Sequence, residues 1–387
     1  MSCPACRHDG MNGFHHEPSV PANSNVLLDD PAAARAFPTG AITLGHCPQC
    51  GFISNVDFDD ELAEYSQRYE ETQGFSARFL EFATDLATHW VYRYDLTGKD
   101  VLEIGCGKGE FLVLMADAGI GSGIGIDPGV KPERIVTQHA DKLTWMPRRF
   151  TAEDDDLVGD AIVCRHTLEH IPNVFGFLSG IRRAIGDRLD TVVLFELPDT
   201  QRILDEVAFW DVYYEHCAYF TQGSVARLFE RCGFEILDLR LEYDGQYLIV
   251  EARPVAEGTI PRPWGHDDLE RIDAAIDHFA REFDAMTSTW RSRLAALATD
   301  NKTSVAWGAN SKAVSFLAVT GDHVAGAVDI NPHKQGTYIA GTGHEILAPA
   351  DLARLQPDLV VAMNPIYLAE IQADLDRFGV AAELVGL

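Results

Sequence analysis

The chain has 387 residues, 46% of them hydrophobic, which is enough for two or three domains with buried cores. Its 31 basic and 59 acidic residues give a formal charge of −28, and such a chain would repel nucleic acid and anionic membranes, so neither is an expected partner. The first residues lack a secretory signal and no apolar run approaches the roughly 20 residues that span a bilayer, so we expect a soluble cytoplasmic protein.

Residues 1–60 contain two C-x-x-C pairs, formed by Cys3 with Cys6 and by Cys47 with Cys50. Two such pairs can close a tetrahedral thiolate shell around Zn²⁺, and without a secretory signal we favour this over a disulfide or a redox pair. Four thiolates leave no open position for a substrate. We therefore predict a structural zinc module over residues 1–60, in which the metal holds together a segment with little core.

Residues 61–96 are predicted to be a helical region that leads into the first strand of the next domain. The region holds a cluster of aromatic and polar side chains, namely Tyr65, Tyr69, Glu70, Gln73 and Phe75. A segment at this place in such a domain often lies over the bound cofactor. Tyr69 and Gln73 are therefore candidate cofactor contacts, and an ordinary amphipathic helix with polar surface residues is the alternative.

The stretch VLEIGCGKGEFL at residues 101–112 begins with an apolar run and then breaks into Gly105, Gly107 and Gly109. This pattern predicts a strand, a tight turn and a helix, and such a turn lets the backbone approach a nucleotide-like cofactor. The spacing is not that of a P-loop, which needs Ser or Thr after Gly-Lys. It is not the G-x-G-x-x-G fingerprint of dinucleotide sites either.

Two acidic residues narrow the choice of cofactor. Glu103, just before the turn, would repel pyrophosphate but could accept a hydrogen bond from the cationic amine of a methionine moiety. Asp127 ends the next predicted strand, where it could accept from ribose hydroxyls. The stretch resembles the first two motifs of class I S-adenosylmethionine-dependent methyltransferases. The resemblance implies S-adenosyl-L-methionine as the cofactor, and a glycine-rich turn without a ligand is the alternative.

Predicted strands alternate with helices from residue 100 to residue 198, which indicates an α/β fold with a parallel sheet covered on both faces. Ligands of such sheets bind beyond the carboxyl ends of the strands. Arg165, His166 and His170 fall at this edge of the predicted sheet. We therefore expect a class I methyltransferase, Rossmann-like domain in which Arg165 and His166 contact the cofactor.

A hairpin through Asp244 and Gly245 is predicted to close this sheet, so the methyltransferase domain is assigned to residues 61–255. Residues 267–297 carry apolar side chains in steps of three and four, which predicts one long helix with one apolar face. This helix is expected to pack between domains or to form a dimer seam, so both a monomer and a homodimer stay open.

Residues 256–387 contain, after this helix, a second and smaller Rossmann-like unit. Its turn, G-A-x-x-K-A, has Gly308 at the bend and Lys312 in the first helical turn, a combination that can hold a phosphate group. Further polar or basic candidates for ligand binding are Asn310, His333, Lys334 and Asn364. We predict an anionic ligand here, with a merely structural repeat of the fold as the alternative.

The segment YYEH at residues 213–216 is the strongest candidate for chemistry. A histidine can take a proton near neutral pH, a neighbouring carboxylate can orient it, and a hydroxyl such as that of Tyr213 or Tyr219 can donate to an enolate oxygen. Adjacent residues on a strand point to opposite faces, so Glu215 need not touch His216, and a tyrosine-rich segment is often core. The rival bases are His166 and His170.

The ordered set of motifs resembles the sugar C-methyltransferases that act on nucleotide-linked deoxy-keto sugars. The set comprises the C-x-x-C pairs, G-C-G-x-G, HIP, Y-x-E-H-x-x-Y-F and a terminal unit with G-A-x-x-K-A and D-x-N-P-x-K-x-G, and it covers almost the whole chain. The resemblance implies that His216 is the base and that Tyr213 and Glu215 bind the substrate or orient the base. It also implies that the zinc module and the C-terminal unit embrace the substrate, with the nucleotide diphosphate in the C-terminal unit.

Methylation of carbon requires an adjacent carbonyl group that stabilises a carbanion. The predicted reaction is therefore base-assisted enolate formation followed by in-line methyl transfer. The alternatives are an O- or N-methyltransferase of another activated small molecule, an NAD-dependent oxidoreductase and a non-catalytic cofactor-binding partner of a biosynthetic enzyme. The oxidoreductase is disfavoured because the turn at Gly308 lacks the G-x-G-x-x-G spacing.

Overall fold

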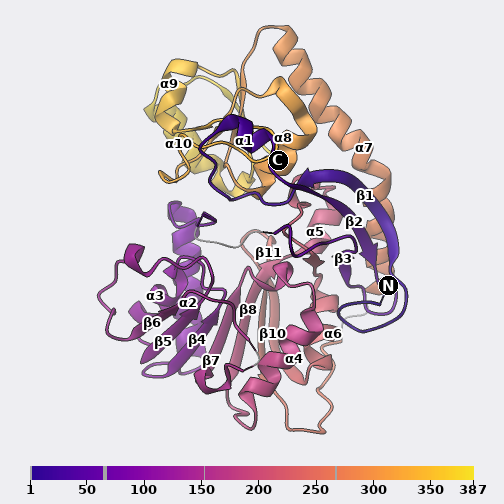
Figure 1. The fold of residues 1–387 in the computed structure, drawn as a ribbon, viewed down its shortest axis with the longest axis vertical. Helices are drawn as coiled ribbons and strands as arrows, with labels where there is room; N and C mark the ends of the chain where they lie inside the picture. The colour runs from indigo at the N-terminus through magenta and orange to yellow at the C-terminus, as the bar shows by residue number, and fades with distance from the viewer. Residues whose placement is uncertain (1, 64–67, 152, 266–267) are drawn as a thin grey trace.

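The computed structural model describes residues 2–63, 68–151, 153–265 and 268–387. Tyr65 and Asp267, which belong to two of the predicted helices, lie outside the described residues. Figure 1 shows a lower and an upper body, with the N-terminal strands and one long helix beside them. No helix within the described ranges is long and apolar enough to cross a membrane.

The lower body is built on a seven-stranded sheet in the order β10-β11-β8-β7-β4-β5-β6. Its strands are β4 (Asp100–Ile104), β5 (Ser122–Ile126), β6 (Leu143–Met146), β7 (Ala161–Arg165), β8 (Val192–Pro198), β10 (Phe234–Glu242) and β11 (Tyr247–Pro254). Strands β4 to β8 are parallel, and β11 is antiparallel to both β8 and β10. The strand order reverses between β4 and β7, which opens a crevice at their carboxyl ends.

Helices cover both faces of this sheet. The helices of this part of the chain are α2 (Ala77–Arg93), α3 (Glu110–Asp117), α4 (Val174–Ile185), α5 (Thr200–Asp205) and α6 (Gln222–Arg231). Val101 and Ala161 pack in one apolar cluster with α2 and α3, whereas Leu102 and Ile162, one position further on, pack in another with α4 and α6. Alternate residues of a strand point to opposite faces, so the apolar runs of these strands are buried on both sides, as predicted.

The predicted helical region over residues 61–96 is shorter in the structure. Helix α2 begins only at Ala77, where the side chain of Ser76 caps it by accepting from the N–H of Phe79 at 3.2 Å. Residues 68–76 form no helix. A serine that caps a helix has a non-helical backbone, so the helical pattern stops there, and the preceding residues are available to cover the crevice.

The N-terminal region forms a four-stranded antiparallel sheet together with one strand of the lower body. In order, the strands are β1 (Asn12–Pro21), β2 (Thr39–His46), β3 (Ile53–Asn55) and β9 (Ala218–Tyr219). The loop between β1 and β2 carries α1 (Pro31–Arg35) and lies against the upper body, where the N–H of Tyr338 donates to the carbonyl of Leu28 at 2.9 Å. The N-terminal region therefore joins the two bodies (Figure 1).

The upper body is a parallel sheet in the order β14-β13-β12-β15-β16. Its strands and helices are β12 (Ser304–Trp307), α8 (Ser311–Thr320), β13 (Ala327–Val328), β14 (Ile346–Leu347), α9 (Leu352–Leu355), β15 (Leu359–Ala362), α10 (Leu368–Arg377) and β16 (Glu383–Gly386). The strand order reverses between β12 and β15, so this sheet has a crevice of its own.

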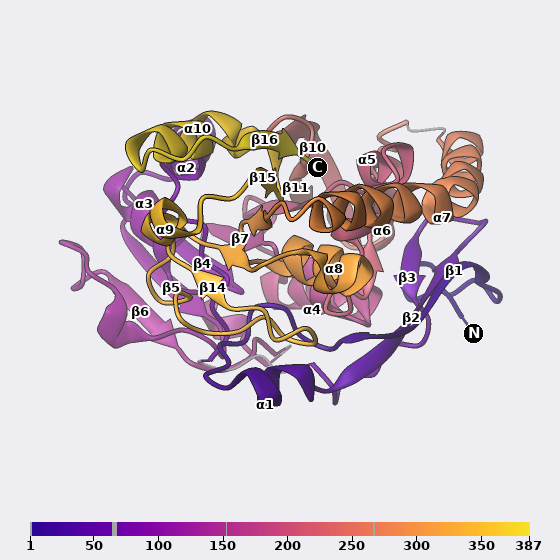
Figure 2. The same ribbon diagram turned by 90° about the horizontal axis from the view of Figure 1, so that it is seen from above.

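The predicted long helix is α7 (Leu269–Thr299). Its buried residues Ile272, Phe279 and Leu294 share a core with β1 and α8, and Figure 2 shows α7 extending from beside the N-terminal strands toward the upper body. Short 3-10 turns complete the structure, namely η1 (Pro132–Arg134), η2 (Asp155–Leu157), η3 (Leu168–His170), η4 (Phe209–Asp211), η5 (Gly321–His323), η6 (Pro349–Asp351) and η7 (Pro365–Tyr367).

Candidate functional site

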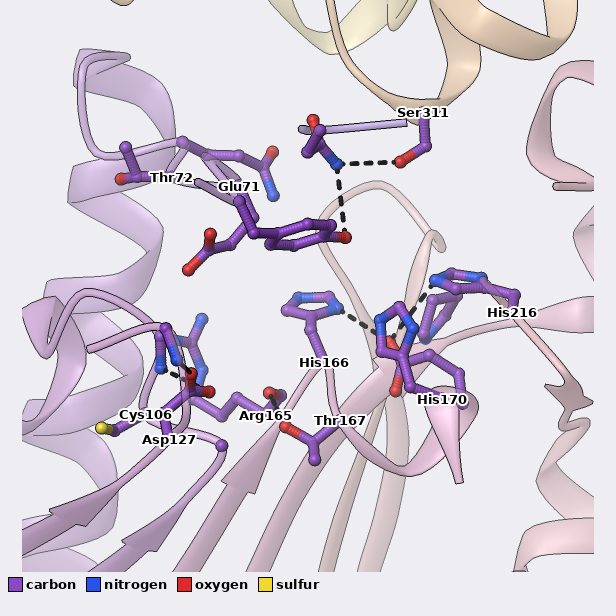
Figure 3. A pocket seen from close by; sticks show the side chains of 18 of the residues that line it. Glu71, Thr72, Cys106, Asp127, Arg165, His166, Thr167, His170, His216 and Ser311 are labelled. Atoms are coloured by element: carbon purple, nitrogen blue, oxygen red, sulfur yellow. Dashed lines mark hydrogen bonds and ion pairs between the residues drawn. The ribbon is translucent and has the colours of Figure 1, made fainter. Parts of the chain in front are cut away.

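A cavity of about 630 Å³ lies at the carboxyl ends of β4, β5 and β7 (Figure 3). The glycine-rich turn after β4 lines one part of it, and His166 and His216 line another. Ser311 and Lys312, at the start of α8, line it from the upper body. The cavity therefore joins the predicted cofactor site to residues that the sequence assigned to the acceptor.

Glycine is required in the turn after β4 for two reasons. Gly105, Gly107 and Gly109 have positive φ values of 74°, 52° and 80°, which other residues adopt at a cost. A Cβ atom on Gly105 would also lie 1.9 Å from Oγ1 of Thr167, so a larger residue does not fit there. Gly105 and Gly107 line the cavity, whereas Gly109 does not line it and is the residue that caps α3.

The two acidic residues predicted to hold the cofactor both line the cavity. Asp127 accepts from the N–H groups of Gly107 at 3.2 Å and Gly129 at 2.6 Å, which fixes the turn. Glu103 is 2% exposed, and no described residue forms a hydrogen bond with its Oε2 atom. Burial raises the pKa of Glu103 to about 8, because the charged form loses solvation. A buried carboxyl group of this kind fits a ligand that brings a cationic amine.

The segment before α2 lies over this cavity. Tyr69 and Gln73, the two candidate cofactor contacts of this segment, both line it. The carbonyl of Tyr69 accepts from Nζ of Lys108 at 2.7 Å, and Oε1 of Gln73 accepts from the hydroxyl of Tyr367 at 3.0 Å. The segment is thereby tied to the glycine turn and to the upper body. Glu71, which the sequence interpretation passed over, also lines the cavity, 3.3 Å from Lys108, and no motif marks it (Figure 3).

Arg165 and His166 line the cavity, and both bind the carboxylate of Glu196 at the end of β8. Nε of Arg165 donates to Glu196 at 2.5 Å, and Nε2 of His166 lies 2.9 Å from the other oxygen. Burial alone would lower the pKa of His166, but the carboxylates of Glu196 and Glu169 outweigh it and raise this pKa to about 9. His166 is therefore cationic at neutral pH, which makes it a poor base.

Tyr213 and His216 form a pair at the other end of the cavity. The Tyr213 hydroxyl lies 3.0 Å from Nε2 of His216, and the ring of His170 packs edge-on against His216 at a centroid distance of 4.8 Å. Burial lowers the pKa of His216 well below its usual value, and the neighbouring His170 and His166 act in the same direction. The imidazole of His216 is therefore neutral and able to accept a proton.

Glu215 and Tyr219 lie outside the cavity lining, and the carboxylate of Glu215, a candidate to bind the substrate or orient the base, points toward the N-terminal loop. The carboxylate of Glu215 accepts from Nδ2 of Asn23 at 3.0 Å and from the N–H of Ser24 at 3.1 Å. The segment turns before β9 instead of running as a strand, which sends this side chain toward the N-terminal loop. The Tyr219 hydroxyl donates to the backbone carbonyl of Tyr213 at 3.4 Å. Both residues position the segment from behind the cavity.

A second cavity of about 690 Å³ lies in the crevice of the upper body. It is lined by four of the predicted ligand contacts, namely Gly308, Asn310, Lys334 and Asn364. The other two lie elsewhere. Lys312 projects into the first cavity and forms an ion pair with Asp211 at 3.0 Å, and His333 is exposed beside Phe75. Of the two predicted lysines, Lys334 from the loop after β13 therefore lines the upper crevice, whereas Lys312 of α8 lines the first cavity.

Lys334 is the buried lysine of this crevice, which the exposed Arg377 also lines. It is 4% exposed, and its Nζ donates to Oδ1 of Asn25 and to the carbonyl of Ala309, both at 3.0 Å. No carboxylate among the described residues forms an ion pair with it. Asn25 comes from the N-terminal loop, and neither a motif nor a pattern in the sequence pointed to this contact.

The four cysteines of the two C-x-x-C pairs meet in one cluster. The Sγ atoms of Cys3 and Cys50 lie 3.7 Å apart, those of Cys6 and Cys47 lie 3.6 Å apart, and all four are within 4.8 Å of one another. Four thiols at these separations fit a tetrahedral metal site. The cluster lies beside β3. This strand pairs with β9, which begins two residues after His216.

Two family models match the chain. The model of a methyltransferase domain matches residues 73–239, and the model of a C-methyltransferase C-terminal domain matches residues 268–382. The chain is similar to C-methyltransferase NovU of Streptomyces niveus, with 27% identity over 395 residues that cover 95% of this chain and 90% of that protein.

Other similar proteins match less than half of this chain. The ubiquinone biosynthesis O-methyltransferase of Pseudomonas aeruginosa strain LESB58 is 30% identical over 142 residues, which are 34% of this chain and 60% of that protein. The solved structure of the N,N-8-amino-8-demethyl-D-riboflavin dimethyltransferase RosA from Streptomyces davawensis has 21% identity, covers 46% of this chain and 56% of that chain, and has a TM-score of 0.35.

Proposed function

Because the chain belongs to the C-methyltransferase family of S-adenosylmethionine-dependent methyltransferases, we propose that it adds a methyl group to a carbon atom of a nucleotide-linked keto-deoxysugar. The observation that carries this proposal is that the two cavities adjoin. They share Gln73, Asn310 and Asn364 in their linings. A ligand anchored in the upper crevice can therefore reach the cavity that holds the glycine turn and His216.

The first cavity is proposed to hold the methyl donor. S-adenosylmethionine, when bound, supplies a methyl group that the substrate carbanion takes from its positively charged sulfur. Glu103 would accept from the ammonium group of the cofactor and Asp127 from its ribose hydroxyls, while Tyr69 and Gln73 exclude water from above. The unpartnered Oε2 atom of Glu103 supports this assignment.

The upper crevice is proposed to hold the nucleotide diphosphate of the acceptor. A buried cation is costly unless an anion accompanies it, and Lys334 has only neutral partners among the described residues. Asn310 lines the same crevice and would offer its amide nitrogen to the nucleotide, whereas the amide of Asn364 is held by Gln246. The charge and the burial of Lys334 therefore support an anionic ligand.

His216 is proposed to be the base. Its neutral imidazole would take a proton from the carbon next to the keto group, and the electron pair of that C–H bond would pass to the keto oxygen as the enolate forms. The Tyr213 hydroxyl, 3.0 Å from the same ring nitrogen, would then turn to donate to the enolate oxygen. The cation of His166 lies in the same cavity and adds a favourable field.

The metal of the cysteine cluster is proposed to be zinc, since four thiolates are a common structural zinc shell. The cluster supports β3, and Ile53 of β3 pairs with Tyr219 of β9. The zinc would therefore help to place the segment that carries His216, and it would take no part in the chemistry.

The test uses NMR to monitor the exchange of solvent deuterium into the acidic carbon of a nucleotide diphosphate keto-deoxysugar. His216→Ala is expected to slow exchange by at least about 100-fold, because the proton acceptor is gone. S-adenosylhomocysteine affinity, measured by calorimetry, should stay within about twofold of wild type.

His139→Ala is the matched control, because this partly buried histidine lies 2.9 Å from Asp117 and does not line either cavity. Retained exchange in His216→Ala with loss in His170→Ala would make His170 the base. A product whose new methyl group sits on oxygen or nitrogen, read from its carbon shift, would overturn the C-methylation itself.

A further inference from the structure

Three potential metal ligands meet in the first cavity. The carboxylate of Glu169 and one ring nitrogen each of His170 and His216 lie within 4.8 Å of one another, and all three residues line the cavity. Figure 3 shows the rings of His170 and His216 side by side. Glu169 and His170 belong to η3, which follows β7, whereas His216 precedes β9, so the fold brings the group together.

Glu169 needs a cation that the described residues supply only in part. It is 1% exposed, and neither of its carboxylate oxygens has a hydrogen-bond partner among the described residues. The nearest cationic group is His166, whose Nδ1 lies 3.5 Å away and whose Nε2 is already bound to Glu196. A buried carboxylate with no hydrogen bond, whose one close cation is shared with Glu196, is destabilised by the loss of solvation, and a bound metal ion would offset that cost.

His170 has the surroundings of a metal-binding histidine. Its Nδ1 lies 2.9 Å from the backbone carbonyl of Glu215, and protein metal sites commonly orient a ligating imidazole through such a carbonyl. The carbonyl is itself held in place, because the Glu215 carboxylate is bound by Asn23 and Ser24 of the N-terminal loop. The ring of His170 is therefore oriented before any ion arrives.

We propose that Glu169, His170 and His216 bind one divalent ion of the first transition series, such as Zn²⁺ or Co²⁺. Two imidazoles and one carboxylate form a donor set that these ions favour, and cavity water would complete the shell. Ligands at about 2.1 Å from an ion stand roughly 3.5 Å apart, so the cluster has to contract by about 1 Å. Tyr213, which now lies 3.0 Å from Nε2 of His216, would give up this hydrogen bond.

The consequence for activity rests on the proposed role of His216 as base. A bound ion takes the same electron pair of the imidazole that accepts the substrate proton. Metal occupancy and proton abstraction therefore exclude each other, and the ion is an inhibitor that competes for the base.

Binding is tested by titrating the zinc-loaded enzyme with Co²⁺ and following visible absorption. Wild type is expected to bind one Co²⁺ and to show the weak absorption bands of nitrogen and oxygen ligands. Exchange of Co²⁺ into the cysteine cluster would instead produce strong thiolate bands, which we do not expect. Glu169→Gln and His170→Ala are each expected to weaken Co²⁺ binding at least about tenfold. His139→Ala, which removes a histidine beside Asp117 and away from the cluster, should bind Co²⁺ as wild type does.

Calorimetry with S-adenosylhomocysteine shows whether each variant is folded. The metal site would be overturned if wild type bound no Co²⁺ or showed only thiolate-type absorption. It would also be overturned if folded Glu169→Gln and His170→Ala bound Co²⁺ as tightly as wild type. These measurements need no methyl acceptor, so their failure is distinct from failure of the proposed function. In the exchange assay Co²⁺ should slow deuterium uptake in proportion to occupancy, and faster uptake would overturn the inhibitory role.

Discussion

The two bodies of the molecule contain the same turn in opposite electrostatic settings. In the lower body the N–H of Gly107 donates to Asp127 at 3.2 Å, and in the upper body the N–H of Ala309 donates to Asp329 at 2.9 Å. In both, the acid directly follows the second of the parallel strands, and the strand order of the sheet reverses beside the first. The backbone arrangement is therefore shared, and the difference lies in the side chains around it.

The lower turn offers a buried carboxyl group, Glu103, and its helix begins at Gly109 without a side-chain cap. The upper turn offers a buried ammonium group, Lys334, and the side chain of Asn310 caps its helix by accepting from the N–H of Lys312. The first turn therefore suits a ligand with a cationic end and the second an anionic ligand. Under the proposed function, one backbone design would serve two ligands of opposite charge, and single buried groups would set which ligand each turn accepts.

The two turns should differ most in how alanine at their first glycine, Gly105 or Gly308, changes the affinity for S-adenosylhomocysteine. Gly105→Ala places a Cβ 1.9 Å from Oγ1 of Thr167 at a φ of 74°, so the turn has to move. S-adenosylhomocysteine affinity, measured by calorimetry, should fall at least about 100-fold, or roughly 2.7 kcal/mol.

Gly308→Ala is the matched change in the upper body. Its φ is 105°, but the nearest atom, Cβ of Met363, lies 3.4 Å away. We expect unchanged S-adenosylhomocysteine affinity and a free energy of unfolding lowered by about 1 to 2 kcal/mol, from backbone strain alone. Equal cofactor loss in both variants would mean that the turns are coupled and that the comparison fails.

The sequence predicted what local patterns determine. The apolar runs, the glycine spacing and the two C-x-x-C pairs are local patterns, and the structure confirms the α/β fold, the strand, turn and helix around Gly105 and the four-cysteine cluster. The sequence could not predict which side chains from distant segments meet. Lys312 faces Asp211, and Glu215 faces Asn23, which is 192 positions away in the chain. Such contacts depend on how separate segments pack, which spacing does not encode.

The protonation of Glu103 provides the next test of the comparison. Its pKa of about 8 in the free enzyme means that the carboxyl is largely protonated at pH 7, whereas an ammonium ligand prefers the carboxylate. S-adenosylhomocysteine binding should therefore release a proton below pH 8, and affinity should rise roughly tenfold from pH 6.5 to 8 and then level off.

Glu103→Gln should bind the same ligand about tenfold more weakly at pH 8 and without this pH dependence, because no proton is exchanged. Calorimetry in buffers of different ionisation enthalpy measures the proton release directly. Asp329→Asn, the change at the acid of the upper turn, is the control and should leave both quantities unchanged. A pH dependence that survives in Glu103→Gln would assign the proton to another group.

The smallest effect is expected in the upper crevice, where Lys334 and Lys312 are compared as partners of a phosphate group. Lys334→Met removes a buried ammonium group that donates to the Ala309 carbonyl beside the turn. The affinity for uridine diphosphate or thymidine diphosphate should therefore fall about fivefold, or roughly 1 kcal/mol. Lys312→Met should leave that affinity unchanged, because Lys312 is engaged with Asp211 in the other cavity. Urea unfolding of both variants corrects for stability. If Lys312→Met lowered this affinity and Lys334→Met did not, Lys312 would be the phosphate ligand. The cation of the upper turn would then come from α8.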